Sequence, residues 1–200
     1  MSNPFSYPTT PHVRKHGPAG YREWENYRPW LRDEFDFRCV YCLCREKWGR
    51  RRSSWVVEHL VPREKAQHLA LEYSNLVYAC SSCNSAKSAK WVPDPCQHAY
   101  GQLVYVTNDG KIHAKNADGR KFIRTLALDE DDLTNYREMW LHILQSWKKH
   151  EPERYRQCMS FPDNLPDLTQ KIPPNNTKPE GANNCCYQQR KQNKLPEIYG

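Results

Sequence analysis

The chain has 200 residues, a net charge of +7 and a mean hydropathy of −0.97. This length fits one domain with extensions, and the low hydropathy indicates polar tails rather than a uniformly packed globule. No run approaches the roughly 20 apolar residues of a membrane span, so we expect no membrane partner. The N-terminus lacks a signal-peptide core, and a reducing, cytoplasmic location is expected. There, the nine cysteines favour metal binding over disulfides.

The first half of the chain is predicted to begin flexibly and then to fold. Residues 1–20 are rich in Pro, Gly and polar side chains and are expected to be flexible. Residues 27–35 (YRPWLRDEF) predict a short helix, with a proline in its first turn and apolar residues near one face. Residues 55–62 (WVVEHLVP) predict a buried strand, and residues 80–90 a turn that continues as a helix.

The second half predicts a small sheet, a long helix and a tail, which together with the first half makes an α+β fold. Residues 102–116 favour a hairpin with Asp-Gly at its turn, and residues 121–128 (KFIRTLAL) are expected to complete an antiparallel meander. Residues 129–150 predict a helix with acids first and Lys and His last. Residues 161–200 are rich in Pro and Asn and are expected to be a disordered tail. The apolar stripe of the long helix predicts core packing, with partner docking as the alternative; its members are Leu133, Tyr136, Trp140, Leu144 and Trp147.

Two Cys-x-x-Cys pairs predict a metal site. Cys39 and Cys42 form the first pair, and Cys80 and Cys83 form the second. Four thiolates suit tetrahedral zinc and leave no open position for water or substrate, so this zinc is expected to be structural. Three further residues are alternative ligands: Cys44 in place of Cys42, and Cys96 or His98, which have no paired knuckle.

An acid and a histidine stand side by side in the strand of residues 55–62. Glu58 and His59 are costly in an apolar strand unless they are paired or used chemically. Neighbouring residues of an ideal strand point to opposite faces, yet two groups that serve one phosphate must converge. We therefore expect the strand to bend or end at His59, before Pro62.

The order of these features resembles the HNH endonucleases, the ββα-metal nucleases, in the variant braced by a four-cysteine zinc. The resemblance covers about residues 39–90 and rests on the two knuckles and on Glu58-His59, Asn75, Asn84 and Lys87. It implies a ββα core in which His59 is the general base. Glu58 and Asn84 would hold a catalytic Mg²⁺ or Mn²⁺, Asn75 would brace the loop that orients His59, and Lys87 would contact phosphate or stabilise charge.

Two positions depart from the commoner family pattern and leave the choice of metal open. Glu58 stands where Asp is commoner, and Asn84 stands where His is commoner. Each residue also has a structural alternative. His59 could be a buried histidine bonded to backbone, Glu58 could pair with a nearby Arg, and Asn84 could be a helix cap.

Basic residues concentrate in the same region of the chain. Between residues 38 and 90 there are ten Lys and Arg against four acids, which favours a polyanionic partner. A solvated surface is the alternative. The candidate contacts to a nucleic-acid backbone are Arg45, Lys47, Arg50, Arg51, Arg52, Lys87 and Lys90.

Together these features predict a metal-dependent endonuclease that hydrolyses DNA, with double-stranded DNA as the expected substrate. Residues 21–100 would form the nuclease domain, 101–160 a meander-plus-helix extension, and 161–200 the tail. Small stand-alone proteins of this family resemble nuclease effectors of bacterial anti-phage systems, some of which work with an ATPase partner, so the resemblance implies such a role here. Roles in restriction, homing and phage DNA processing stay open. The alternatives are a zinc-stabilised DNA-binding module without catalysis and an adaptor subunit.

Overall fold

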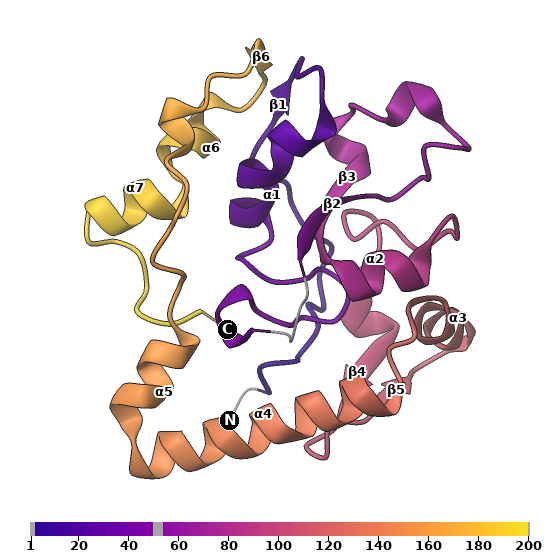
Figure 1. The fold of residues 1–200 in the computed structure, drawn as a ribbon, viewed down its shortest axis with the longest axis vertical. Helices are drawn as coiled ribbons and strands as arrows, with labels where there is room; N and C mark the ends of the chain where they lie inside the picture. Colours follow the sequence, from indigo (N-terminus) through magenta and orange to yellow (C-terminus); the bar gives the residue numbers. More distant parts are fainter. Residues whose placement is uncertain (1–2, 50–53, 200) are drawn as a thin grey trace.

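The chain folds into helices and small two-stranded sheets, which confirms the α+β class. A computed structural model describes residues 3–49 and 54–199. Within these ranges the strands form three antiparallel pairs, and none of the sheets is larger than two strands. Figure 1 shows the longest helix along the lower edge of the molecule.

The segment with the two cysteine pairs forms two strands followed by a helix. β2 (Trp55–His59) pairs antiparallel with β3 (Leu76–Cys80), and α2 (Ser81–Lys87) follows without a gap and contacts both strands. All five residues of β3 are buried. The register places Glu58 opposite Val77. The predicted ββα order is confirmed, and β2 ends at His59 as expected.

A helix from the N-terminal part covers this unit. α1 (Arg28–Glu34) begins with a proline in its first turn, and Trp30 and Leu31 are fully buried. The helix contacts β3 and β2. The predicted helix of residues 27–35 is therefore confirmed, and its apolar face packs on the hairpin. The short 3-10 helices are η1 (Trp24–Tyr27), η2 (Glu46–Trp48), η3 (Gln67–Leu69), η4 (Tyr73–Asn75), η5 (Tyr100–Gln102) and η6 (Leu168–Gln170).

The predicted meander is a hairpin followed by a helix. β4 (Val104–Val106) and β5 (Ile112–Ala114) form the expected hairpin. The prediction of a third strand is wrong, because the chain instead forms α3 (Ala117–Leu126). The Asn116 side chain caps this helix by accepting a hydrogen bond from the Gly119 N–H at 2.8 Å. Apolar side chains at helical spacing then pack this helix against the rest of the molecule; they are Phe122, Ile123 and Leu126.

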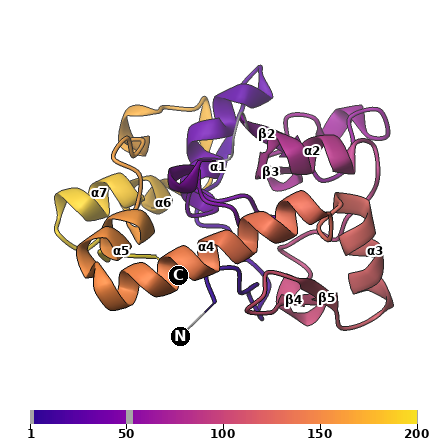
Figure 2. The same cartoon turned by 60° about the horizontal axis from the view of Figure 1, so that its bottom comes forward.

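The long helix lies against the rest of the molecule along its apolar stripe. α4 (Asp131–His150) buries Leu133 and Leu144, and the Trp140 ring stacks on Trp48 with centroids 4.9 Å apart. These contacts confirm core packing for Leu133, Trp140 and Leu144 of this stripe. Figure 2 shows α4 reaching from α3 and the β4–β5 hairpin on one side to α5 (Pro152–Met159) on the other.

Residues 3–20 and 161–199 are packed, which corrects the expectation of a flexible start and a disordered tail. β1 (Pro18–Ala19) pairs with β6 (Asn175–Asn176), so the two segments hold each other. The tail also contains α6 (Pro179–Asn183) and α7 (Cys186–Lys191). Polar composition did not prevent packing because buried polar side chains bond the backbone of these segments. Asp33, for example, accepts a hydrogen bond from the Cys186 N–H at 2.8 Å.

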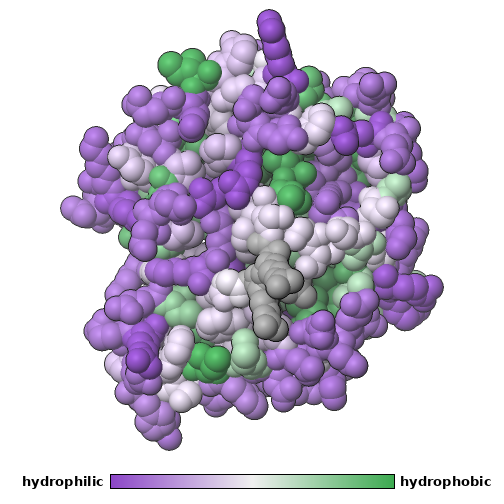
Figure 3. Space-filling model, viewed as in Figure 1, coloured by the Kyte–Doolittle hydropathy of each residue, from purple (hydrophilic) through white to green (hydrophobic). Residues whose placement is uncertain are grey.

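The outer surface is mostly hydrophilic in the view of Figure 3, where apolar residues gather only in small separate patches. Among the described residues, no helix combines the length and the apolar character that crossing a membrane requires.

Candidate functional site

The four predicted cysteines come together in one buried cluster. The sulfur atoms of Cys39, Cys42, Cys80 and Cys83 all lie within 4.8 Å of one another. Tetrahedral zinc with Zn–S bonds of about 2.3 Å places its sulfur ligands about 3.8 Å apart. The Sγ atoms of Cys42 and Cys80 are 3.8 Å apart. The donor set and its spacing therefore fit a structural zinc ion, as the sequence predicts.

Backbone hydrogen bonds bring the two knuckles together. An antiparallel bridge between Arg38 and Arg45 closes the turn of the first knuckle. The Val40 N–H then donates to the Tyr78 carbonyl at 3.0 Å, which joins this turn to β3. The second knuckle lies where β3 ends at Cys80 and α2 begins. One ion can therefore tie the hairpin, the helix and the preceding turn together.

The alternative ligands do not belong to this cluster. Cys44 is buried, but the four clustered sulfur atoms do not include its own, and its carbonyl accepts a hydrogen bond from the Cys39 N–H. Cys96 is partly exposed and His98 is exposed, and neither belongs to the cluster. Burial raises the pKa of the Cys39 thiol. A bound divalent cation would reverse this effect by favouring the thiolate.

A groove of about 960 Å³ runs beside the hairpin and α2. Three of the predicted catalytic residues line it: Glu58 and His59 at the end of β2, and Asn84 on α2. Asn84 is the fourth residue of α2, whose N-cap position is Cys80, so it is not the helix cap that the alternative proposed. Because the strand ends at His59, the acid and the histidine can both line one groove.

The imidazole of His59 is held in one tautomer by a backbone carbonyl. Its Nε2 lies 3.0 Å from the Ala70 carbonyl oxygen. A carbonyl can only accept, so Nε2 carries the proton and Nδ1 keeps its lone pair. Burial lowers the pKa of His59, and the imidazole is therefore neutral at neutral pH. A neutral imidazole with an unprotonated Nδ1 can accept a proton from water.

Asn75 fastens the loop that supplies this carbonyl. Its Oδ1 accepts a hydrogen bond from the Val61 N–H at 2.8 Å, and its Nδ2 donates to the carbonyls of Val61 and Leu69 at 3.1 and 3.2 Å. Leu69 directly precedes Ala70, the partner of His59. This geometry suits the predicted role of Asn75 as a brace, and it places Asn75 outside the groove lining.

Lys87 differs from its predicted role as a phosphate contact. Its side chain is 0% exposed, and its Nζ donates to Glu58 Oε1 and to the His59 carbonyl, both at 2.7 Å. The expected partner of Glu58 was an arginine or a metal ion, and the structure supplies this lysine. Burial raises the pKa of Glu58, and the ion pair opposes part of that rise. Lys87 therefore positions the carboxylate and the end of β2.

The remaining basic candidates have different surroundings. Arg45 is buried, which contradicts a role in DNA contact: its guanidinium donates to the carbonyls of Tyr199 at 2.6 Å and Met159 at 3.3 Å. Lys47 is exposed and bonds the Ser160 hydroxyl, and Lys90 is exposed on the surface after α2. The predicted contacts Arg50, Arg51 and Arg52 lie outside the described residues.

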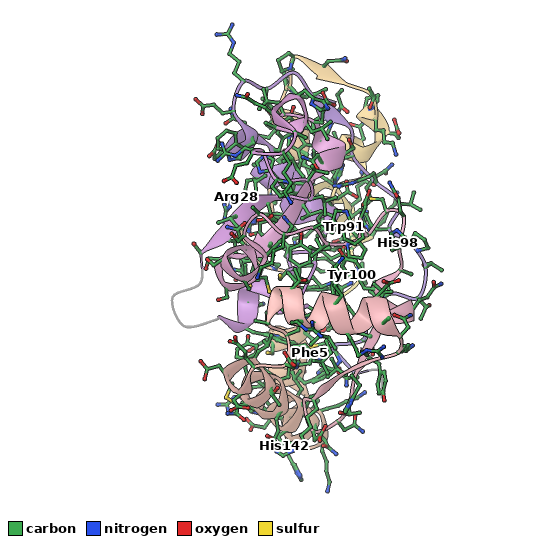
Figure 4. The ribbon with its side chains drawn as sticks, turned by 90° about the vertical axis from the view of Figure 1, so that its right-hand side faces the viewer. Phe5, Arg28, Trp91, His98, Tyr100 and His142 are labelled. Carbon is green, nitrogen blue, oxygen red and sulfur yellow. The ribbon has the colours of Figure 1, made fainter. Side chains whose placement is uncertain are left out.

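The groove also has a wall that the sequence did not predict. Trp24 and Arg28, from η1 and the start of α1, line it together with Arg63. Arg28 Nε donates to the Trp55 carbonyl at 3.1 Å, so it lies beside β2 (Figure 4). Arg63 follows Pro62 directly, and the sequence indicates only that it belongs to the basic segment of residues 38–90. Trp24 lies far upstream, and no local pattern links it to the groove.

Comparison with known protein families identifies the segment that carries these features. Residues 39–90 match the family model described as HNH endonuclease, which is 52 of 200 residues, or about a quarter of the chain. The match and the cysteine cluster support a nuclease-family assignment for this segment, in the variant with a four-cysteine metal site. A search of curated proteins found no match to the chain.

Proposed function

We propose that this protein is a metal-dependent endonuclease that hydrolyses phosphodiester bonds of DNA. The observation that carries the proposal is the His59 imidazole, whose Nε2 is held by a backbone carbonyl and whose Nδ1 is unprotonated. It lines the same groove as an acid and an amide, Glu58 and Asn84. This groove is built by the segment that matches the HNH endonucleases.

Each residue has a chemical task in this proposal. His59 Nδ1 accepts a proton from water, whose oxygen bonds to phosphorus as the P–O3′ bond breaks, and the leaving O3′ takes a proton from solvent, which gives 5′-phosphate and 3′-hydroxyl ends. Glu58 and the amide oxygen of Asn84 would hold Mg²⁺ or Mn²⁺, which stabilises negative charge on the phosphate and the leaving oxygen. Lys87 keeps the Glu58 carboxylate in place from the side away from the groove.

The charges along the groove support a requirement for a divalent cation. Its described lining includes three carboxylates, Glu25, Glu58 and Glu64, against two guanidinium groups, Arg28 and Arg63. Because Glu58 already pairs with Lys87, these groups carry no net positive charge, and a cation in the groove would strengthen the binding of a phosphodiester. The proposed metal would supply that charge next to the reacting phosphate.

Plasmid cleavage tests the proposal directly. We expect the wild-type protein to nick or linearise plasmid DNA with Mg²⁺ or Mn²⁺, and we expect His59→Ala to lose activity by at least about 100-fold because the proton acceptor is gone. Circular dichroism and zinc content should stay unchanged in the variant. Equal inactivity of wild type and variant with every divalent ion would contradict the enzymatic proposal. Salt-sensitive binding without cleavage would then favour a zinc-stabilised DNA-binding module.

The biological setting that we propose is a cytoplasmic nuclease effector of an anti-phage system, acting with an ATPase partner. Its support is the family resemblance of a small nuclease with a basic segment. Phage challenge of cells that express wild type or His59→Ala tests it, because protection should require the histidine.

A further inference from the structure

The burial of Lys87 leaves open which side chain meets the phosphate backbone in the groove. Of the two arginines that line the groove, Arg28 already donates its Nε to the Trp55 carbonyl. Arg63 is exposed, and within residues 3–49 and 54–199 its contact is with an aromatic ring rather than with an acid or a carbonyl. Its N–H groups are therefore available to a ligand in the groove.

Trp24 holds the Arg63 guanidinium beside the proposed general base. The centre of the guanidinium lies 4.1 Å from the Trp24 ring centroid, and the Trp24 ring meets His59 edge to face at 5.7 Å. A guanidinium stacked on an indole loses rotational freedom but keeps the N–H groups at its edge free. That edge can bind two phosphate oxygens at once, with a geometry that suits a phosphodiester.

We propose that Arg63, oriented by Trp24, binds the phosphate backbone of the DNA substrate next to His59. This inference deepens the proposed function and rests on it. It also gives the N-terminal segment a part in the site, since Trp24 lies outside the matched residues 39–90. The η1 segment would then form the wall that holds the Arg63 guanidinium next to the reacting phosphate.

Because acids lie beside it, Arg63 should contribute more to DNA affinity than a basic residue elsewhere on the surface. Glu25 and Glu64 line the same groove and repel a polyanion. Removing one of two guanidinium groups there changes the local charge balance, whereas removing a cation elsewhere on a +7 chain changes it little. Arg154 is a suitable control, because it is exposed on α5 and pairs with Glu151 three residues earlier. Figures 1 and 2 both place α5 on the opposite side of the molecule from α2.

Binding of a fluorescein-labelled DNA duplex tests the proposal. All variants are made in the His59→Ala background with Mg²⁺ present, so that DNA binds without being cut, and anisotropy is measured over a range of KCl concentrations. We expect Arg63→Gln to weaken binding about tenfold at low salt and to reduce the slope of log K against log salt by about 1. Arg63→Lys should keep the slope and lose only part of the affinity, and Arg154→Gln should match the parent.

Trp24 variants separate orientation from charge. Trp24→Phe keeps an aromatic face and should bind within about twofold of the parent, whereas Trp24→Leu should lose about fivefold with an unchanged salt slope. In the active background, Arg63→Gln should raise KM more than it lowers kcat. Zinc content and circular dichroism report folding of each variant.

Several results would overturn the inference. The first would be a DNA affinity and a KM of the Arg63→Gln variant that equal those of the Arg154→Gln variant. Another is a loss confined to Arg28→Gln, which would assign the contact to the other arginine. If the parent protein binds no DNA and the wild type cuts none, the proposed function fails together with this inference. Normal cleavage with an unaffected Arg63→Gln contradicts the inference alone.

Discussion

Lys87 and Arg45 show how burial changes what a basic side chain can do. An exposed lysine or arginine can exchange water for a phosphate, but a buried one must be paired inside the protein. Lys87 bonds Glu58 and the His59 carbonyl, and Arg45 bonds the Tyr199 and Met159 carbonyls. Both residues therefore support the site and the fold, and the cations that line the groove within the described residues are Arg28 and Arg63.

Replacing Lys87 tests this supporting role. Lys87→Met leaves the Glu58 carboxylate buried without its partner, and we expect it to lower the free energy of unfolding by about 3–5 kcal/mol. The double variant Glu58→Gln/Lys87→Met removes the buried charge as well and should recover part of that loss. Chemical denaturation measures both. If the effects of the single variants Glu58→Gln and Lys87→Met add up to that of the double variant, the ion pair contributes nothing to the free energy of unfolding.

Glu34 is a second buried acid, and it joins the start of the chain to the core. Its carboxylate lies 2.7 Å from His12 Nε2 and accepts hydrogen bonds from the N–H groups of Lys15 and His16 and from the Tyr73 hydroxyl. Burial by itself raises the pKa of Glu34, but the hydrogen bonds and nearby positive charges outweigh it and lower the pKa to about 2. The ionised form is therefore the one that the fold stabilises.

This shift predicts a loss of stability in acid. The folded-state pKa lies below the ordinary value of 4.5, so the stabilisation is present above that value and is lost as the pH falls toward about 2. The difference corresponds to about 3 kcal/mol. Denaturation curves measured between pH 7 and pH 2 should show this dependence in wild type and a weaker one in Glu34→Gln. The exposed Glu23→Gln is the control, and an equal pH dependence in both variants would contradict the prediction.

At the scale of elements, α2 serves two sites at once. Cys83 and Lys87 are four residues apart on the buried face, where one belongs to the cysteine cluster and the other holds Glu58. Asn84 and Ser88 are offset by one residue and line the groove. A seven-residue helix has little stability of its own. Its position therefore depends on the metal site at its start.

The proposed catalytic ion should consequently be separable from the ion of the cysteine cluster. Mild chelation should stop cleavage, which added Mg²⁺ or Mn²⁺ restores, while zinc content and circular dichroism stay constant. Cys80→Ser should instead lose zinc and cooperative unfolding, because structural zinc supplies about 10 kcal/mol of folding free energy in small domains. Cys96→Ser, outside the cluster, is the matched control. Retention of zinc and fold in Cys80→Ser would contradict the structural role.

Across the whole molecule, the polar C-terminal segment helps to build a second buried apolar cluster beside the main core. Tyr199 is buried and its ring lies 4.4 Å from that of Phe161, and the Arg45 guanidinium stacks on the Tyr199 ring at 4.0 Å. Residues near the first knuckle are thereby tied to the far end of the chain. The segment gains its order from such contacts rather than from its own composition.

Arg45→Gln tests this tie against a role in DNA binding. The change leaves two buried carbonyls without their donor, and we expect a loss of about 3 kcal/mol in unfolding free energy and faster proteolysis of residues 161–199. Under conditions where the variant is folded, the salt slope of DNA binding should equal that of wild type. A reduced slope with normal stability would instead show that Arg45 contacts phosphate. The exposed Lys90→Gln provides the comparison for a surface cation.

Local chemistry explains which features were predictable. The Cys-x-x-Cys pairs, the helix at residues 27–35, the Asp-Gly hairpin and the end of the strand at His59 each depend on residues close in sequence. Residues 121–128 follow the predicted hairpin and were expected to extend it, but the Asn116 cap and the helical spacing of the buried apolar residues place residues 121–126 in α3. The groove residues His59, Glu58 and Asn84 were predictable because they belong to one ordered pattern.

The four clustered cysteines, the acid-histidine pair and the ββα order could be read from the amino-acid sequence, because they follow from residue chemistry and short-range spacing. The burial of Lys87 and Arg45, the wall that Trp24 and Arg63 form along the groove, and the packing of the polar tail became visible only in the folded chain. Burial depends on which distant segments meet, and composition within a segment does not specify those partners. A basic side chain thus stabilises the fold where it is buried and is available to a ligand where it lines the groove.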